Sequence, residues 1–303
     1  MAYVGRFAPS PTGPLHAGSL LTAVASFLHA RRAGGEWLVR IEDIDSPREV
    51  PGAAGDILRT LEGMDLHWDR PVLYQSTRVD AYSDAVADLL RNGLAFRCSC
   101  SRSELRALAV RHGAAMGYPG TCRSGARREG PTAVRMRVEG SWEPFEDGLQ
   151  KTVCPPMPDG FGDYVIWRRD GLPAYHLAVV VDDGFQGITT IVRGSDLLDS
   201  VPAQRHLQHA LGLPRPRYFH LPIVTTATGE KLSKQSGAVP VDLDDRSNAA
   251  LRVLSRLGLD VPVELRGASP RVLWEWAVTR WSVERLRGMT AIADAPATGT
   301  RAV

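Results

Sequence analysis

The chain has 303 residues, which is enough for one large domain with an insertion or for two domains. Apolar residues make up 44% and charged residues 23%, close to the averages of globular proteins, so we expect a packed core and not a disordered chain. The net charge of +2 by itself indicates no class of partner, and no apolar stretch is long enough to span a bilayer.

The apolar run at residues 19–30 has the composition of a signal-peptide core, but its basic flank, Arg31 and Arg32, lies on the wrong side. We therefore interpret the run as a buried helix and expect a cytoplasmic protein. In that compartment the four cysteines stay reduced, which favours metal binding over disulfides. Nothing in the sequence demands more than a monomer.

The first part of the chain alternates between strand and helix patterns. Strands are predicted at residues 3–7 and 37–41, and helices at residues 15–32, after Pro47, and at 82–92. Such alternation is typical of a parallel sheet with crossover helices. The sequence therefore predicts an α/β fold with a Rossmann-type nucleotide-binding sheet.

The stretch from about residue 97 to 153 interrupts this alternation. Three cysteines lie in it, and residues 96–140 contain nine Arg against three Glu, an excess of six positive charges (9 − 3). Such a patch suits a phosphate backbone, and a solvated Arg-rich face is an equally good interpretation of the charge alone. We interpret the stretch as an insertion.

The α/β pattern returns after the insertion. Strands are predicted at residues 164–167, 178–181, 188–192 and 218–224, with a helix at 196–211. Beyond residue 235 the pattern is purely helical, at residues 248–257, 271–281 and 283–289, and the tail from Ala293 is expected to be disordered.

The segment from Pro14 to Ser19 (PLHAGS) joins a predicted strand to a predicted helix. A helix N-terminus presents unpaired N–H groups and partial positive charge, which suits phosphates. Gly18 lets a nucleotide approach the backbone, and His16 can donate to phosphate oxygens. Taken alone, such a segment is more often a plain turn with a polar start to the helix.

A second segment, from Lys231 to Gln235 (KLSKQ), follows the last predicted strand. Two lysines three positions apart, with a hydroxyl between them, suit a mobile clamp that offsets the charge of a leaving pyrophosphate. By itself this pentapeptide is more often a solvated basic loop.

In this order, the two segments resemble the HIGH and KMSKS signatures of class I aminoacyl-tRNA synthetases. Further segments are similar to the glutamyl/glutaminyl branch of that family: RFAPSPTG at residues 6–13, RIEDID at 40–45, Tyr175 before VVVDD at 179–183, and IVRGSD at 191–196. The resemblance covers residues 3 to 236. The first motif ends in Ser19 instead of His and the second in Gln235 instead of Ser, changes that look usual within the branch.

The resemblance implies an enzyme that activates L-glutamate with ATP. It implies catalytic roles for His16, Ser19, Lys231 and Lys234, and ATP contacts from His16, Gly18 and Lys234. It also implies a glutamate pocket formed by Arg6, Phe7, Ala8, Pro9, Ser10, Glu42, Tyr175 and Arg193. The substrate carboxylate would attack the α-phosphate of ATP, with Mg2+ brought in by the nucleotide.

Charge complementarity fits these implied roles. Glu42 is a natural partner for the substrate ammonium, and Arg6 and Arg193 can grip carboxylates with a bidentate fork. The structural alternatives are a solvated strand end for Glu42, ion pairs for the two arginines and a core position for Tyr175.

The cysteines of the insertion resemble the zinc site of the short members of this branch, which has three thiolates and a tyrosine. The implied ligands are Cys98, Cys100, Tyr118 and Cys122, and one closed zinc site would stabilise a small, loop-rich insertion. Counting cysteines alone would nominate Cys154 as the fourth ligand, and a site without metal is a further alternative.

These patterns divide the chain into four segments. Residues 1–96 and 154–235 are predicted to form the catalytic domain, 97–153 the zinc-containing, acceptor-binding-like insertion, 236–292 a helical region similar to a stem-contact domain, and 293–303 the tail. Only 68 residues (303 − 235) follow Gln235, too few for the anticodon-binding region of a full-length glutamyl enzyme.

The short members of the branch transfer glutamate to the queuosine of tRNA(Asp), so the resemblance implies the anticodon arm of tRNA(Asp) as the partner. A truncated glutamyl-tRNA synthetase that charges the tRNA 3′ end is the first alternative. A non-enzymatic RNA-binding module is the second, although the presence of His16, Glu42, Arg193 and Lys234 together argues against it.

Overall fold

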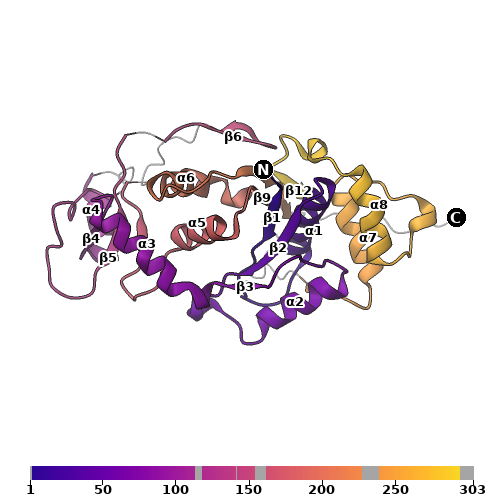
Figure 1. Cartoon of the computed structure of the whole chain (residues 1–303), viewed down its shortest axis with the longest axis horizontal. Helices are drawn as coiled ribbons and strands as arrows, with labels where there is room; N and C mark the ends of the chain where they lie inside the picture. The colour runs from indigo at the N-terminus through magenta and orange to yellow at the C-terminus, as the bar shows by residue number, and fades with distance from the viewer. Residues whose placement is uncertain (1, 113–117, 141, 154–161, 227–238, 294–303) are drawn as a thin grey trace.

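The computed structural model describes residues 2–112, 118–140, 142–153, 162–226 and 239–293. Its centre is an α/β unit, and the predicted α/β class is confirmed (Figure 1). The sheet at this centre is mixed, because most strand pairs are parallel and one hairpin is antiparallel. In the described residues, no helix has the length and apolar character needed to cross a membrane.

Two groups of parallel strands lie edge to edge. The first is β1 (Val4–Phe7), β2 (Glu36–Ile41) and β3 (Leu73–Tyr74), and the second is β9 (Thr190–Gly194), β10 (Arg217–Leu221) and β6 (Phe145–Asp147), with β7 (Lys151–Val153) antiparallel to β6. Thr189 donates its backbone N–H to the carbonyl of Val4 over 2.9 Å, which joins the two groups. Residues far apart in the chain therefore meet along one row of strand ends.

The helices of this part are α1 (Ala17–Arg32), α2 (Ala53–Gly63), α3 (Val79–Arg91), α5 (Tyr175–Gln186) and α6 (Val201–Ala210), with short 3-10 turns at Ser46–Arg48, Gln75–Arg78 and Ser195–Ser200. They share two cores: α1 and α2 pack with β1, β2 and β9, whereas α3, α5 and α6 pack mainly with residues 95–166. Most of α1 is buried, because apolar side chains of both the sheet and the C-terminal helices pack around it. The buried helix expected at residues 15–32 is thus present, beginning at Ala17.

The strand predicted at residues 178–181 is wrong, because these residues lie within α5. Leu177, Val179 and Val180 are buried, so the helix shows no polar stripe in this stretch. A short apolar run buried on all sides has the same sequence pattern in a helix as in a strand. Gly187 ends the helix with a φ of 68°, a left-handed conformation that favours glycine.

An antiparallel sheet lies at the end of the molecule that holds α4 (Arg102–His112) (Figure 1). Its strands are β4 (Ala95–Cys98), β5 (Ala133–Met136) and β8 (Val165–Trp167). The stretch predicted as an insertion also supplies β6 and β7, which pair beside β10. The stretch predicted as an insertion thus contributes strands to both sheets.

The C-terminal part contains α7 (Arg246–Arg256), α8 (Pro270–Arg280) and the 3-10 turns Val263–Leu265 and Val283–Leu286, which share the core of α1. It is not purely helical as predicted, because β12 (Ala291–Ala293) pairs in parallel with β11 (Ile223–Thr225). Ala293, the first residue of the predicted tail, pairs there with Thr225.

Candidate active site

A pocket of about 580 Å³ lies at the ends of β1, β2 and β9, beside the start of α1. Every residue predicted to bind the substrate glutamate lines it: Arg6, Phe7, Ala8, Pro9, Ser10, Glu42, Tyr175 and Arg193. His16, Gly18 and Ser19 line it too, so the predicted ATP segment and the predicted glutamate residues share one cavity. Lys231 and Lys234 lie outside the described residues, and their roles stay predictions.

His16 forms the N-cap of α1. Its Nδ1 accepts from the backbone N–H groups of Gly18 (3.1 Å) and Ser19 (3.4 Å). A ring nitrogen that accepts carries no proton, so the neutral ring is protonated at Nε2, which lies 3.1 Å from the Ser19 hydroxyl oxygen. His16 therefore stabilises the helix start with one nitrogen and presents an N–H donor with the other, beside the positive end of the helix dipole.

Two arginines beneath the pocket share one carboxylate. Asp183 of α5 accepts from Arg6 Nε at 3.2 Å and from Arg40 Nη1 at 2.8 Å, and all three side chains are buried. Burial alone raises the pKa of Asp183, but the two guanidinium groups outweigh burial and hold that pKa below its usual value. Arg40 also donates to Gln186 Oε1 over 2.9 Å. The ion pair named as the structural alternative for Arg6 is thus present, and Arg6 still lines the pocket.

Glu42 lies at the end of β2 and is 9% exposed. Its backbone N–H donates to the carbonyl of Pro9 over 3.0 Å, and its Oε1 accepts from Arg40 Nη2 at 3.3 Å. Burial raises the pKa of Glu42, and the charges of Arg40 and Arg6 only partly oppose this rise. A buried carboxylate whose charged form is disfavoured gains most from a ligand cation, such as an ammonium.

Arg193 extends from β9 and is 4% exposed. Its Nε donates to His220 Nε2 over 3.0 Å and its Nη2 to the carbonyl of Leu197 over 3.1 Å. Its Nη1 is buried and has no hydrogen-bond partner among the described residues. An unpaired, charged donor costs free energy, so this nitrogen is suited to a carboxylate ligand.

The remaining pocket residues contribute shape and backbone. The Phe7 ring stacks on Trp37, with ring centroids 6.4 Å apart, so its side chain belongs to the core. Tyr175 begins α5, and burial raises the pKa of its hydroxyl, which therefore stays protonated as a donor.

Four residues around the pocket were not predicted from the sequence: Asp183 and Arg40 beneath it, His220 beside Arg193, and Asp147, whose Oδ2 lies 2.6 Å from His220 Nδ1. Asp183 and Arg40 lie in segments that carried the family resemblance, and a charged residue in a predicted buried element was the available signal. Asp147 and His220 had none, because their importance comes from a contact across 73 positions of the chain.

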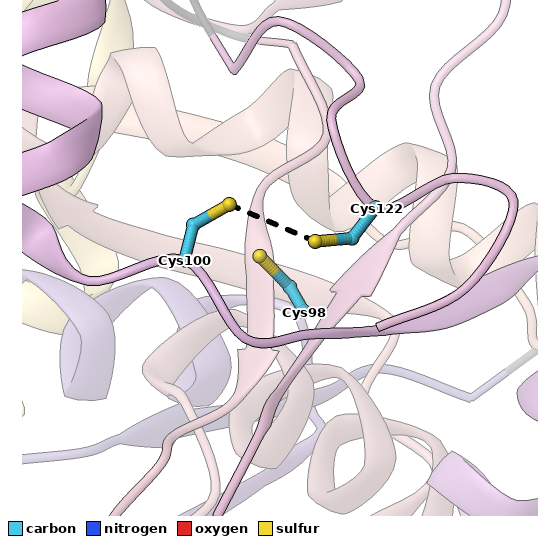
Figure 2. Close-up of side chains that lie close together, drawn as sticks. All are labelled: Cys98, Cys100 and Cys122. Carbon is cyan, nitrogen blue, oxygen red and sulfur yellow. Dashed lines mark hydrogen bonds between the residues drawn. The ribbon is translucent and has the colours of Figure 1, made fainter. Parts of the chain in front are cut away.

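A second cluster forms in the antiparallel region. The sulfur atoms of Cys98, Cys100 and Cys122 all lie within 4.8 Å of one another, and Figure 2 shows the three side chains pointing toward a common centre. The sulfur atoms of Cys100 and Cys122 are 3.6 Å apart. Sulfur ligands held tetrahedrally by zinc at about 2.3 Å lie roughly 3.8 Å from each other, so the spacing fits a zinc ion.

Tyr118 closes this cluster on another side. Its hydroxyl lies 3.3 Å from the Cys98 sulfur and 4.0 Å from the Cys100 sulfur, and it accepts the backbone N–H of Cys122 over 2.8 Å. Burial raises the pKa of the Cys122 thiol, but hydrogen bonds from Tyr118 and from the backbone outweigh burial and bring the pKa to about 6, whereas burial and the neighbouring sulfur atoms raise the pKa of Cys100 to about 11. The positions of the three sulfur atoms and of the Tyr118 hydroxyl fit a zinc ion, and Cys154 lies outside the described residues.

The pocket thus joins the ends of parallel strands, the start of a helix and buried arginines in one place. Residues 3–266 match the family described as tRNA synthetases class I (E and Q), catalytic domain. The crystal structure of glutamate-tRNA synthetase from Elizabethkingia anophelis shares this fold, with a TM-score of 0.82 and 23% identity, covering 97% of this chain and 68% of that one.

Two relatives cover nearly the whole chain. The glutamyl-Q tRNA(Asp) synthetase of Dechloromonas aromatica is 50% identical over 93% of this chain and 95% of its own length. The protein of the same name from Ectopseudomonas mendocina is 46% identical over 97% and 98%. The chain therefore belongs to the class I (E and Q) tRNA synthetases and, within them, to the glutamyl-Q tRNA(Asp) synthetase family.

Proposed function

We propose that this chain activates L-glutamate with ATP and transfers the glutamyl group to the queuosine of tRNA(Asp). One observation carries the proposal: Arg193, whose buried Nη1 has no hydrogen-bond partner among the described residues, and the helix start at His16 line a single pocket. Half of the aligned residues are shared with a relative named glutamyl-Q tRNA(Asp) synthetase, which supports the acceptor.

Activation requires the pocket to hold both carboxylates and the ammonium of glutamate. Arg193 and Arg6 receive the carboxylates and Glu42 the ammonium, with Tyr175 closing the pocket. The α-carboxylate oxygen attacks the α-phosphorus of ATP in line, the bond to the bridging oxygen breaks, and pyrophosphate leaves. The residues contribute position and charge stabilisation, and Mg2+ bound to ATP neutralises phosphate charge.

The phosphates lie at the start of α1 in this proposal. When ATP binds, His16 Nε2–H turns from the Ser19 hydroxyl, 3.1 Å away in the structure, to a phosphate oxygen, while the Gly18 N–H continues to hold His16 Nδ1. Lys231 and Lys234 neutralise the departing pyrophosphate. A hydroxyl of the queuosine cyclopentenediol then attacks the acyl carbon, and AMP leaves.

The anticodon arm is held, in this proposal, by the exposed arginines near the antiparallel sheet. Arg97, Arg102, Arg106 and Arg127 are exposed, whereas Arg123 pairs with Asp163. Only part of the positive excess of residues 96–140 is therefore available to phosphates. We further propose one zinc ion at Cys98, Cys100, Tyr118 and Cys122, and a cytoplasmic monomer.

The first test is pyrophosphate exchange without tRNA. Exchange should occur with glutamate and be on the order of 10²-fold weaker with glutamine, because a neutral amide leaves the buried Arg193 charge poorly paired. Arg193→Lys keeps the charge but cannot bind His220, the Leu197 carbonyl and a carboxylate together, so it should lower exchange with glutamate. Arg217→Lys, on the exposed end of β10, should not. Equal exchange with glutamine, or none until tRNA is added, would contradict the proposal.

The second test identifies the acceptor nucleoside. Trimming the tRNA 3′ end is preferable to periodate, since the queuosine diol is itself sensitive to periodate. Trimmed tRNA(Asp) should accept glutamate, and tRNA(Asp) from cells unable to make queuosine should not. The reverse pattern would identify a glutamyl-tRNA synthetase acting at the 3′ end.

A further inference from the structure

A chain of three side chains runs across the adjacent strands β6, β10 and β9 to the pocket. The Oδ2 atom of Asp147, at the end of β6, lies 2.6 Å from Nδ1 of His220 in β10. The Nε2 atom of His220 lies 3.0 Å from Nε of Arg193. All three side chains are at most 4% exposed, and neither Asp147 nor His220 lines the pocket.

These contacts fix the protons of the His220 ring. Arg193 Nε is always a donor, so His220 Nε2 must accept and carries no proton. The ring proton therefore lies on Nδ1 and is donated to the Asp147 carboxylate. Burial lowers the pKa of His220, and the Asp147 carboxylate only partly opposes this, which agrees with a neutral ring.

We propose that Asp147 and His220 are positioning residues that orient the Arg193 guanidinium for the side-chain carboxylate of glutamate, by holding His220 in its Nδ1–H tautomer. This inference rests on the proposed function, in which Arg193 binds that carboxylate. With Nε held by His220 and Nη2 by the Leu197 carbonyl, the guanidinium plane cannot turn, and Nη1 remains for the ligand. A pre-oriented donor loses little conformational entropy when the substrate binds.

Asp147→Asn tests the tautomer with little change in shape. Asp147 Oδ1 accepts the backbone N–H groups of Leu149 and Gln150, both at 2.9 Å, and the amide oxygen of asparagine can keep these bonds. The amide nitrogen then faces His220 Nδ1 and donates to it, so the ring proton moves to Nε2. Two donors, Nε2–H and Arg193 Nε–H, now oppose each other, and Arg193 turns away.

The expected result is a change in KM with little change in kcat. The KM for glutamate in pyrophosphate exchange should rise about 10- to 100-fold, the range for a hydrogen bond to a charged group, while kcat changes less than about threefold. The KM for ATP should not change. Tyr218→Phe, on the same strand as His220, is the matched control. It removes the buried hydrogen bond that Gln208 donates to the Tyr218 hydroxyl and does not change the tautomer of His220.

Two substitutions of His220 separate its two contacts. The amide of His220→Gln reaches the position of Nε2 and can accept from Arg193, whereas the amide of His220→Asn matches Nδ1 and reaches only Asp147. The KM for glutamate should therefore stay within about threefold in His220→Gln and rise in His220→Asn. In the His220→Gln background, Asp147→Asn should add less than about threefold, because no imidazole tautomer remains to be reversed.

Nitrogen-15 NMR of the ring observes the tautomer without any activity. The His220 signals, assigned from the spectrum of His220→Gln, should show Nδ1–H in the natural protein and Nε2–H in Asp147→Asn. An unchanged KM in folded Asp147→Asn, equal effects of Gln and Asn at His220, or an Nε2–H ring in the natural protein would overturn the inference. Failure of the proposed function would differ, since the natural protein would then show no glutamate-dependent exchange while the NMR result still decides the tautomer.

Discussion

Replacing Asp183 by asparagine tests how the buried charges beneath the pocket are balanced. Asp183 is 4% exposed and accepts hydrogen bonds from Arg6 and Arg40, which are also buried. Asparagine has the same shape, but it removes the negative charge and turns one acceptor into a donor. One of the two guanidinium groups then loses its partner in an environment of low polarity.

The expected loss of stability follows from the burial of this ion pair. Removing one partner of a buried ion pair costs about 3 to 5 kcal/mol, because the remaining charge stays desolvated. With an unfolding entropy of about 2.1 cal/mol/K per residue over 303 residues, the melting temperature should fall by about 5 to 8 °C. The KM for glutamate should rise as well, since Arg6 lines the pocket.

The assay is thermal denaturation of both proteins across pH. The pKa of Asp183 is lower in the folded state than in the unfolded state, where it is about 3.9. The ionised carboxylate therefore contributes its full stabilisation above the unfolded-state pKa, and this stabilisation is lost as the pH falls through the folded-state pKa. The difference between the two proteins should be full at pH 7 and pH 5 and shrink below about pH 4.

The matched control is Asp88→Asn. Asp88 pairs with Arg91 on the exposed surface of α3, where the same substitution should leave the melting temperature nearly unchanged. A fall of less than about 2 °C in Asp183→Asn would refute the reasoning, because it would mean that water or a shifted pKa already relieves the buried charges.

Three further predictions concern single positions. Glu42→Gln should be as stable as the natural protein at pH 7, because burial raises the folded-state pKa of Glu42 and its charge therefore opposes folding at that pH. The KM for glutamate should rise. A clearly lower melting temperature of Glu42→Gln would contradict this. Metal analysis should find about one zinc per chain, lost in Cys98→Ser and kept in Cys154→Ser; full occupancy in Cys98→Ser would exclude this ligand. Gly35→Ala should destabilise the protein by about 1 to 3 kcal/mol, because its Cβ would lie 2.4 Å from a backbone oxygen. Gly55→Ala in α2 should stabilise it by about 0.5 to 1 kcal/mol, because its Cβ would face only the end of a flexible side chain. Equal denaturation midpoints of the two variants would contradict both expectations.

The amino-acid sequence by itself predicted the α/β class and which residues gather at the pocket. The alternation of strand and helix patterns is a local property, and the segments around Arg6, His16, Glu42 and Arg193 carry enough ordered residues to be recognised without a structure. Because parallel strands end at one edge of a sheet, residues that follow β1, β2 and β9 had to meet there.

Only the tertiary structure decided the features that depend on burial and on distant partners. Residues 178–181 are helical although their apolar run is equally compatible with a strand, and Ala291–Ala293 pairs with β11 although nothing local indicates it. Asp147 lies in the predicted insertion and contacts His220, 73 positions away, because β6 and β10 are neighbours in the sheet. A hydrogen bond, a tautomer or a shifted pKa depends on which groups surround a side chain in space, and sequence spacing does not carry that information.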